Sequence, residues 1–65
     1  MPHMTVEELA AMVDEWREAE KQREFWCSAY VMAGEHPSRS LFMAAADEWR
    51  NTSATHREAI EAALK

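Results

Sequence analysis

Residues that break or cross-link a chain are scarce in this sequence. Its 65 residues include one glycine, two prolines and one cysteine. A single cysteine excludes an intramolecular disulfide and fits a reducing compartment better than secretion. No apolar run reaches the roughly 18–20 residues that span a bilayer, and the N-terminus lacks the basic and apolar regions of a secretory signal. We therefore expect a cytoplasmic protein without a membrane segment.

Motifs for catalysis, cofactors or metals are also missing. The three histidines and Cys27 do not have zinc-finger spacing. Cys27 has no base nearby in the sequence, since His36 lies nine residues on, and nucleophilic catalysis needs such a base. Neither half of the chain contains the Glu-x-x-His pair of di-iron bundles. We predict no enzyme activity, no catalytic residues, no cofactor and no metal site.

The glycine and one of the two prolines divide the chain into two similar halves. Gly34, the only glycine, lies near the midpoint, and Pro37 follows it. Glycine ends helices because it adopts positive φ, and proline disfavours helical geometry in the residue before it. Both tracts are rich in helix formers. We predict an all-α antiparallel helical hairpin as one domain over 5–65, with helices at 5–33 and 38–64 and a turn at 34–37. Residues 1–4 are interpreted as a disordered start or a cloning scar.

The first tract carries a helix start signal and an amphipathic stripe. Thr5 and Glu8 have the spacing of a capping box, and Glu7 and Glu8 place negative charge at the positive end of the helix dipole. The stripe residues recur at alternating steps of three and four, a period near 3.5 that favours a packed helix over a strand. They are Leu9, Met12, Val13, Trp16, Ala19, Arg23, Trp26, Tyr30 and Ala33.

The second tract is amphipathic but has a weak point. Residues 51–55, Asn-Thr-Ser-Ala-Thr, compete for backbone hydrogen bonds, and Thr55 and Glu58 have the spacing of a second capping box. Two readings stay open: one continuous helix, which the unbroken phase of the stripe favours, or a break near 51–54. The stripe comprises Phe42, Ala45, Trp49, Thr52, His56, Ala59 or Ile60, Ala63 and Leu64.

Besides Thr52, two polar residues fall on these stripes. Arg23 is expected either to lay its stem on a tryptophan or to pair with Glu20 or Glu48. His56 is expected to bond to a neighbouring hydroxyl, with an interfacial pH switch as the alternative. Folding the halves together places each tryptophan near a small residue, which lets antiparallel helices interdigitate.

More apolar side chains gather near the turn than one helix–helix seam can cover. Monomeric proteins rarely expose so large an apolar surface, and aromatic residues and methionine are enriched where proteins bind one another. We expect a homodimer that forms a four-helix bundle, a docking face for another protein, or both. The candidate interface residues are Phe25, Trp26, Tyr30, Val31, Met32, Leu41, Phe42 and Met43, with Trp16 and Trp49 farther from the turn.

The sequence therefore predicts a small interaction module that self-associates and binds another protein, as regulators and inhibitors do, including ones encoded by phage. In length and hairpin form alone, it resembles the small dimeric hairpins typified by Rop, a plasmid RNA-binding regulator. That resemblance gives one alternative, a nucleic-acid regulator, and the acidic composition gives another, a nucleic-acid mimic. A third is a structural subunit of a larger assembly. A net charge of −5 disfavours nucleic-acid binding, which relies on clustered Lys and Arg.

Overall fold

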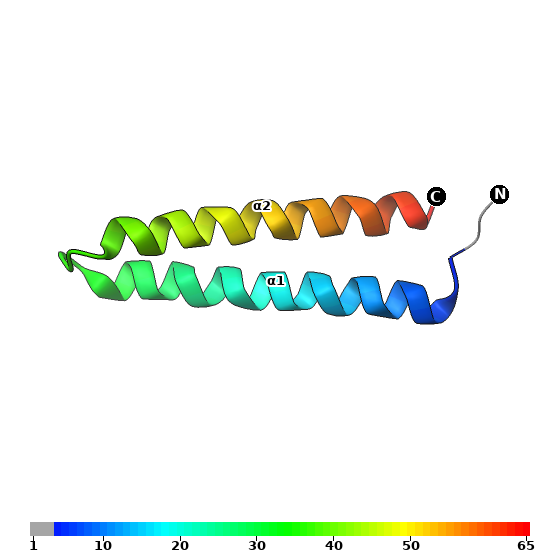
Figure 1. Cartoon of the computed structure of the whole chain (residues 1–65), viewed down its shortest axis with the longest axis horizontal. Coiled ribbons are helices and arrows are strands. Elements are labelled where there is room, and N and C mark those ends of the chain that lie inside the picture. Colours follow the sequence, from blue (N-terminus) through cyan, green and yellow to red (C-terminus); the bar gives the residue numbers. More distant parts are fainter. Residues whose placement is uncertain (1–3) are drawn as a thin grey trace.

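The chain folds into two long helices that lie side by side and run in opposite directions (Figure 1). The computed structural model describes residues 4–65, in which helix α1 spans Val6–Ala33 and helix α2 spans Arg39–Ala63. The predicted all-α hairpin is confirmed, and each helix boundary lies within one residue of the expected position. The interpretation of residues 1–4 falls outside the described residues except at Met4.

Helix α1 begins at the predicted cap. The backbone amide of Glu8 donates to the Thr5 hydroxyl at 3.1 Å. In a capping box the Glu8 carboxylate would accept from the Thr5 backbone amide, but here it accepts from the Thr5 hydroxyl at 3.2 Å. A threonine hydroxyl can accept and donate at once, so one side chain serves both bonds and holds the first turn.

The turn between the helices depends on Gly34. Its φ of 59° is the only positive φ among the described residues, and its ψ is −115°. These torsions match the first central position of a type II′ turn rather than the left-handed helical cap that commonly ends a helix. The amide of His36 closes the turn by donating to the Ala33 carbonyl at 2.9 Å. Helix α2 then starts after Pro37, with the Ser38 amide donating to Nδ1 of His36 at 3.0 Å.

Helix α2 is continuous through residues 51–55, so the alternative of a break near 51–54 is wrong. The Thr52 hydroxyl donates to the Glu48 carbonyl and the Thr55 hydroxyl donates to the Asn51 carbonyl, both at 3.0 Å. Each hydroxyl thus bonds one turn back along the helix, and Thr55 does not cap a new one. Packing of the neighbouring Ser53 against α1 outweighs the low helix propensity of this segment.

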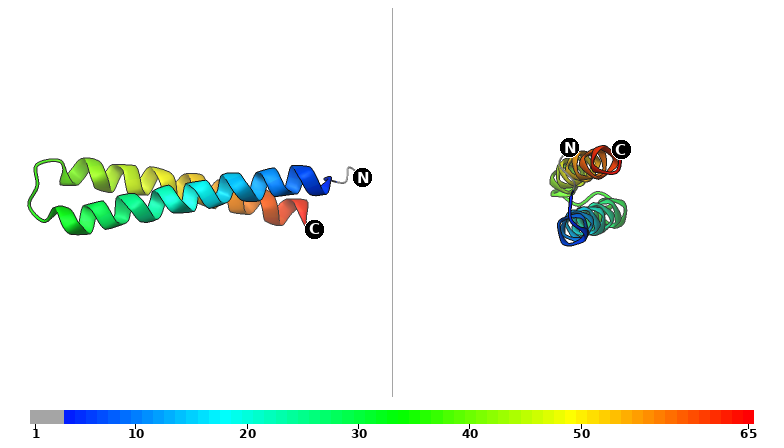
Figure 2. Two further views of the ribbon diagram at one scale, coloured as in Figure 1. Left: turned by 90° about the horizontal axis from the view of Figure 1, so that it is seen from below. Right: turned by 90° about the vertical axis from the view of Figure 1, so that its right-hand side faces the viewer.

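The core is unusually small. Only Ala19, Ala46 and Ser53 are buried among the described residues, at 1%, 4% and 4% exposure, and no large side chain is fully buried. Seen end-on, the molecule is a pair of rods with no further layer (Figure 2). It measures 52 × 15 × 12 Å, with a radius of gyration of 15.0 Å, against about 10.7 Å for a compact domain of this length. Small residues therefore let the helices approach, while the large side chains stay partly exposed.

Candidate interaction surface

The ten predicted interface residues separate into two groups. Five of them are half-buried in the seam between the helices, namely Trp16, Trp26, Tyr30, Phe42 and Trp49. The other five are exposed: Phe25 (60%), Val31 (76%), Met32 (84%), Leu41 (68%) and Met43 (41%). The first group holds the hairpin together and is only partly accessible, so the second group offers most of the apolar surface that a partner could cover without unfolding the chain.

The half-buried aromatic residues lock the turn end of the seam. The rings of Trp26 on α1 and Phe42 on α2 lie 5.8 Å apart, and Phe25 meets Trp26 edge-on at 5.0 Å. His36 stacks on Phe42, with the ring centres 6.1 Å apart. This chain of rings ties both helices to the turn, so the exposed residues around it sit on a firm support.

A cation–π contact adds to that support. The Arg39 guanidinium lies 4.0 Å from the centre of the Tyr30 ring, which joins the first turn of α2 to the last turns of α1. Sequence reasoning missed both Arg39 and His36. The only feature of the sequence that could have indicated these contacts is the position of both residues beside the turn, where the chain reversal brings them onto aromatic rings.

The exposed apolar residues lie on two flanks of the hairpin. At 3.6 residues per turn, Phe25 and Cys27 point about 200° apart around α1. On one flank, side chains from both helices line a groove of about 200 Å³. We call it the Cys27 groove, and it is lined by Cys27, Tyr30, Val31, Met43, Ala46, Asp47 and Arg50. Phe25 and Met32, seven residues apart, share a different face of α1.

Cys27 is exposed, although its neighbours in the sequence include Phe25, Trp26 and Tyr30. Its side chain lines the groove instead of filling the seam.

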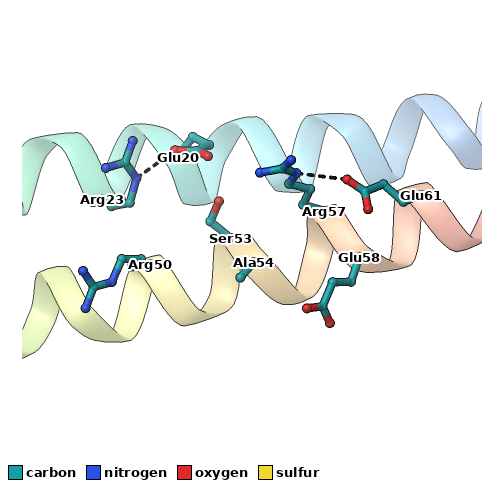
Figure 3. Close-up of a pocket in the computed structure, with 8 residues that line it drawn as sticks. All are labelled: Glu20, Arg23, Arg50, Ser53, Ala54, Arg57, Glu58 and Glu61. Carbon is teal, nitrogen blue, oxygen red and sulfur yellow. Dashed lines mark hydrogen bonds and ion pairs between the residues drawn. The ribbon is translucent and has the colours of Figure 1, made fainter.

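Farther from the turn the seam becomes polar, in a larger groove of about 390 Å³ (Figure 3). Arg23 donates to Glu20 at 2.8 Å, one of the two partners expected for it. The buried Ser53 side chain points from α2 toward α1 beside Glu20 (Figure 3). The hydrogen bond from Arg23, and after it the Ser53 hydroxyl, hold the pKa of the Glu20 carboxyl below its ordinary value of 4.5. Glu20 in turn raises the pKa of Arg23.

The other guanidinium groups of this groove are also paired. Arg50 contacts Asp47 at 2.8 Å and Arg57 contacts Glu61 at 3.0 Å, and both pairs lie within α2. Because every arginine lining the groove already meets a carboxylate, the groove offers no concentrated positive charge to an anion. Ser53 could not be recognised as a core residue from the sequence, because a serine does not add to the apolar pattern that marks the stripe.

Two side chains near the middle of the seam have unusual surroundings. The indole Nε1 of Trp16 is buried and has no hydrogen-bond partner within residues 4–65. For His56, the nearest ionic partner is Glu15 across the seam, with 3.8 Å between Nδ1 and Oε2. The Thr52 hydroxyl, a candidate partner for His56, instead bonds to the backbone of its own helix.

The residues that the structure describes contain neither a candidate metal site nor a membrane-spanning helix. Across residues 4–65, no three His, Cys, Asp or Glu side chains gather to hold a metal ion. Neither helix has the length and apolar character to cross a membrane. Comparisons with models of protein families, with curated proteins and with solved structures find no match.

Proposed function

We propose that this chain is a protein-interaction module that self-associates and acts by binding another protein, as a small regulator or inhibitor does. The observation that carries the proposal is the excess of exposed surface. The accessible surface is 5260 Å² for a mass of 7.5 kDa. A compact monomer of that mass exposes about 4,200 Å². The difference is roughly 1,000 Å², comparable with the roughly 800 Å² that each partner buries in a standard interface.

The character of the surface supports the same conclusion. Five large apolar side chains are exposed around the turn, and three of them, Val31, Met32 and Leu41, are more than two-thirds exposed. The aromatic chain beneath them is held from both helices. A firm support beneath protruding apolar residues favours binding, because little ordering is needed when a partner covers it.

The single exposed cysteine fits a reducing compartment such as the cytoplasm. In an oxidising compartment an unpaired exposed thiol forms disulfides between molecules. We therefore propose a cytoplasmic location for the chain.

The test compares the natural chain with a triple variant, Phe25→Ser, Val31→Ser and Leu41→Ser. All three side chains are exposed, so the hairpin should still fold, which circular dichroism checks. We expect the variant to sediment as a lighter species and to lose proteins that co-purify with the natural chain. Equal mass and equal co-purification for the two chains would refute the proposal. A variant of Trp26 or Phe42 is a poorer test, because both residues hold the seam.

A further inference from the structure

The two flanks of the turn end differ in shape and charge, and this difference bears on which of them pairs with a second copy. The Cys27 groove joins α1 and α2, with Ala46 at its buried base and Val31 protruding beside it. The protruding residue and the depression lie next to each other on one surface. A two-fold dimer needs this combination, because each copy then offers its protrusion to the other's depression.

Charge also favours a second copy on this flank. The chain carries a net charge of −5, so two copies repel over most of their surfaces. The Cys27 groove has only two charged residues, Asp47 and Arg50, which pair with each other at 2.8 Å. The groove is therefore electrically balanced. A two-fold axis would also bring the Asp47 of one copy toward the Arg50 of the other if the helices align in register.

The position of the groove along the hairpin fixes how the copies would lie. Arg50 lines both the Cys27 groove and the polar groove that follows it toward the chain termini. A copy placed with its turn toward the termini of the other would cover apolar residues with ion pairs. A copy placed turn beside turn covers apolar residues with apolar residues, which is the favourable arrangement.

We infer that a second copy of this chain occupies the Cys27 groove, with the two turns at the same end of the dimer. This inference rests on the self-association in the proposed function and adds the face that is used. The flank with Phe25 and Met32 then stays open for a different protein.

The native cysteine makes a direct test possible. In this dimer the two Cys27 side chains face a shared interface, so a short bis-maleimide should link them. A relocation variant, Cys27→Ser with Met32→Cys, carries its thiol on the opposite flank. At a concentration where sedimentation shows dimer, we expect the natural chain to cross-link at least tenfold faster than the relocation variant.

A second comparison uses charge instead of a thiol. Val31→Glu places a carboxylate at the groove, while Met32→Glu places one on the other flank. Both residues are more than three-quarters exposed in the hairpin, so neither change should unfold it. We expect Val31→Glu to weaken dimerisation at least tenfold and Met32→Glu to weaken it less than threefold.

The outcomes separate the inference from the proposed function. A dimer that cross-links through position 32 and is weakened by Met32→Glu overturns the choice of face and leaves self-association in place. A chain that stays monomeric at all concentrations overturns both. A dimer that cross-links through Cys27 and is weakened by Val31→Glu supports the inference.

Discussion

Enlarging Ala19 tests whether the helices pack against each other at the least exposed residue of the core. Ala19 is 1% exposed, the lowest value among the described residues that form the core, and it lies next to Glu20, whose carboxylate adjoins the buried Ser53. Ala19→Leu adds three carbon atoms to a site without free volume. Overpacking of this kind costs about 1–3 kcal/mol. Alanine and leucine have similar helix propensities, so the change in helix propensity is small.

The control is Ala11→Leu, on the same helix at an exposed position. A domain of 65 residues has a total stability of about 3–10 kcal/mol, so a loss near 2 kcal/mol is a large fraction of it. At about 4–8 °C per kcal/mol, the melting temperature of Ala19→Leu should fall by about 8–16 °C, and that of Ala11→Leu should stay within about 3 °C. Circular dichroism at 222 nm during heating and in urea measures both. Equal stability of the two variants would refute the packing described for α1 and α2.

Three further substitutions probe the turn, the polar seam and the aromatic chain. Gly34→Ala should cost about 1–2 kcal/mol in urea unfolding, because an L-residue is strained at φ 59°. Glu35→Ala is its control, and equal losses would count against the type II′ turn. Glu20→Gln should lower stability at pH 7, since a carboxyl with a lowered pKa stabilises the fold above its unfolded pKa. That stabilisation is lost as the pH falls through the lowered pKa, so the difference between the two chains should shrink below pH 4.5; a pH-independent difference would contradict the Arg23 pairing. Trp26→Ala should cost about 2 kcal/mol, near half the loss for a fully buried aromatic residue, and Phe25→Ala less than about 1 kcal/mol. The reverse order would place Phe25 in the seam.

The hairpin could be predicted from the sequence because its signals are local. One glycine, the capping spacing of Thr5 and Glu8, and a stripe with a period near 3.5 each specify helix or turn without reference to the rest of the chain. The type II′ geometry at Gly34 could not be predicted, because glycine admits several positive-φ conformations. The continuity of α2 could not be predicted for a related reason. The helix propensity of residues 51–55 is low, and it is packing against α1 that keeps them helical.

The candidate surface could be predicted only in part. The five half-buried candidates all lie on the two predicted stripes and the five exposed ones all lie off them, so periodicity separates the residues that pack the hairpin from those that face outward. Periodicity does not show which small residues are buried between the helices, namely Ala19, Ala46 and Ser53. Val31 and Met32 adjoin in sequence yet lie on different flanks, and Cys27 lines a groove that forms only when Met43 and Ala46 come alongside it.

The central claim is that a second copy of the chain covers one flank of the apolar surface around the turn, and solution mass tests the self-association most directly. Sedimentation equilibrium over a wide range of concentrations measures that mass without modifying the chain. The account predicts a species of about 15 kDa, twice the 7.5 kDa of one chain, that dissociates only on dilution. A single species of 7.5 kDa at every concentration would contradict it.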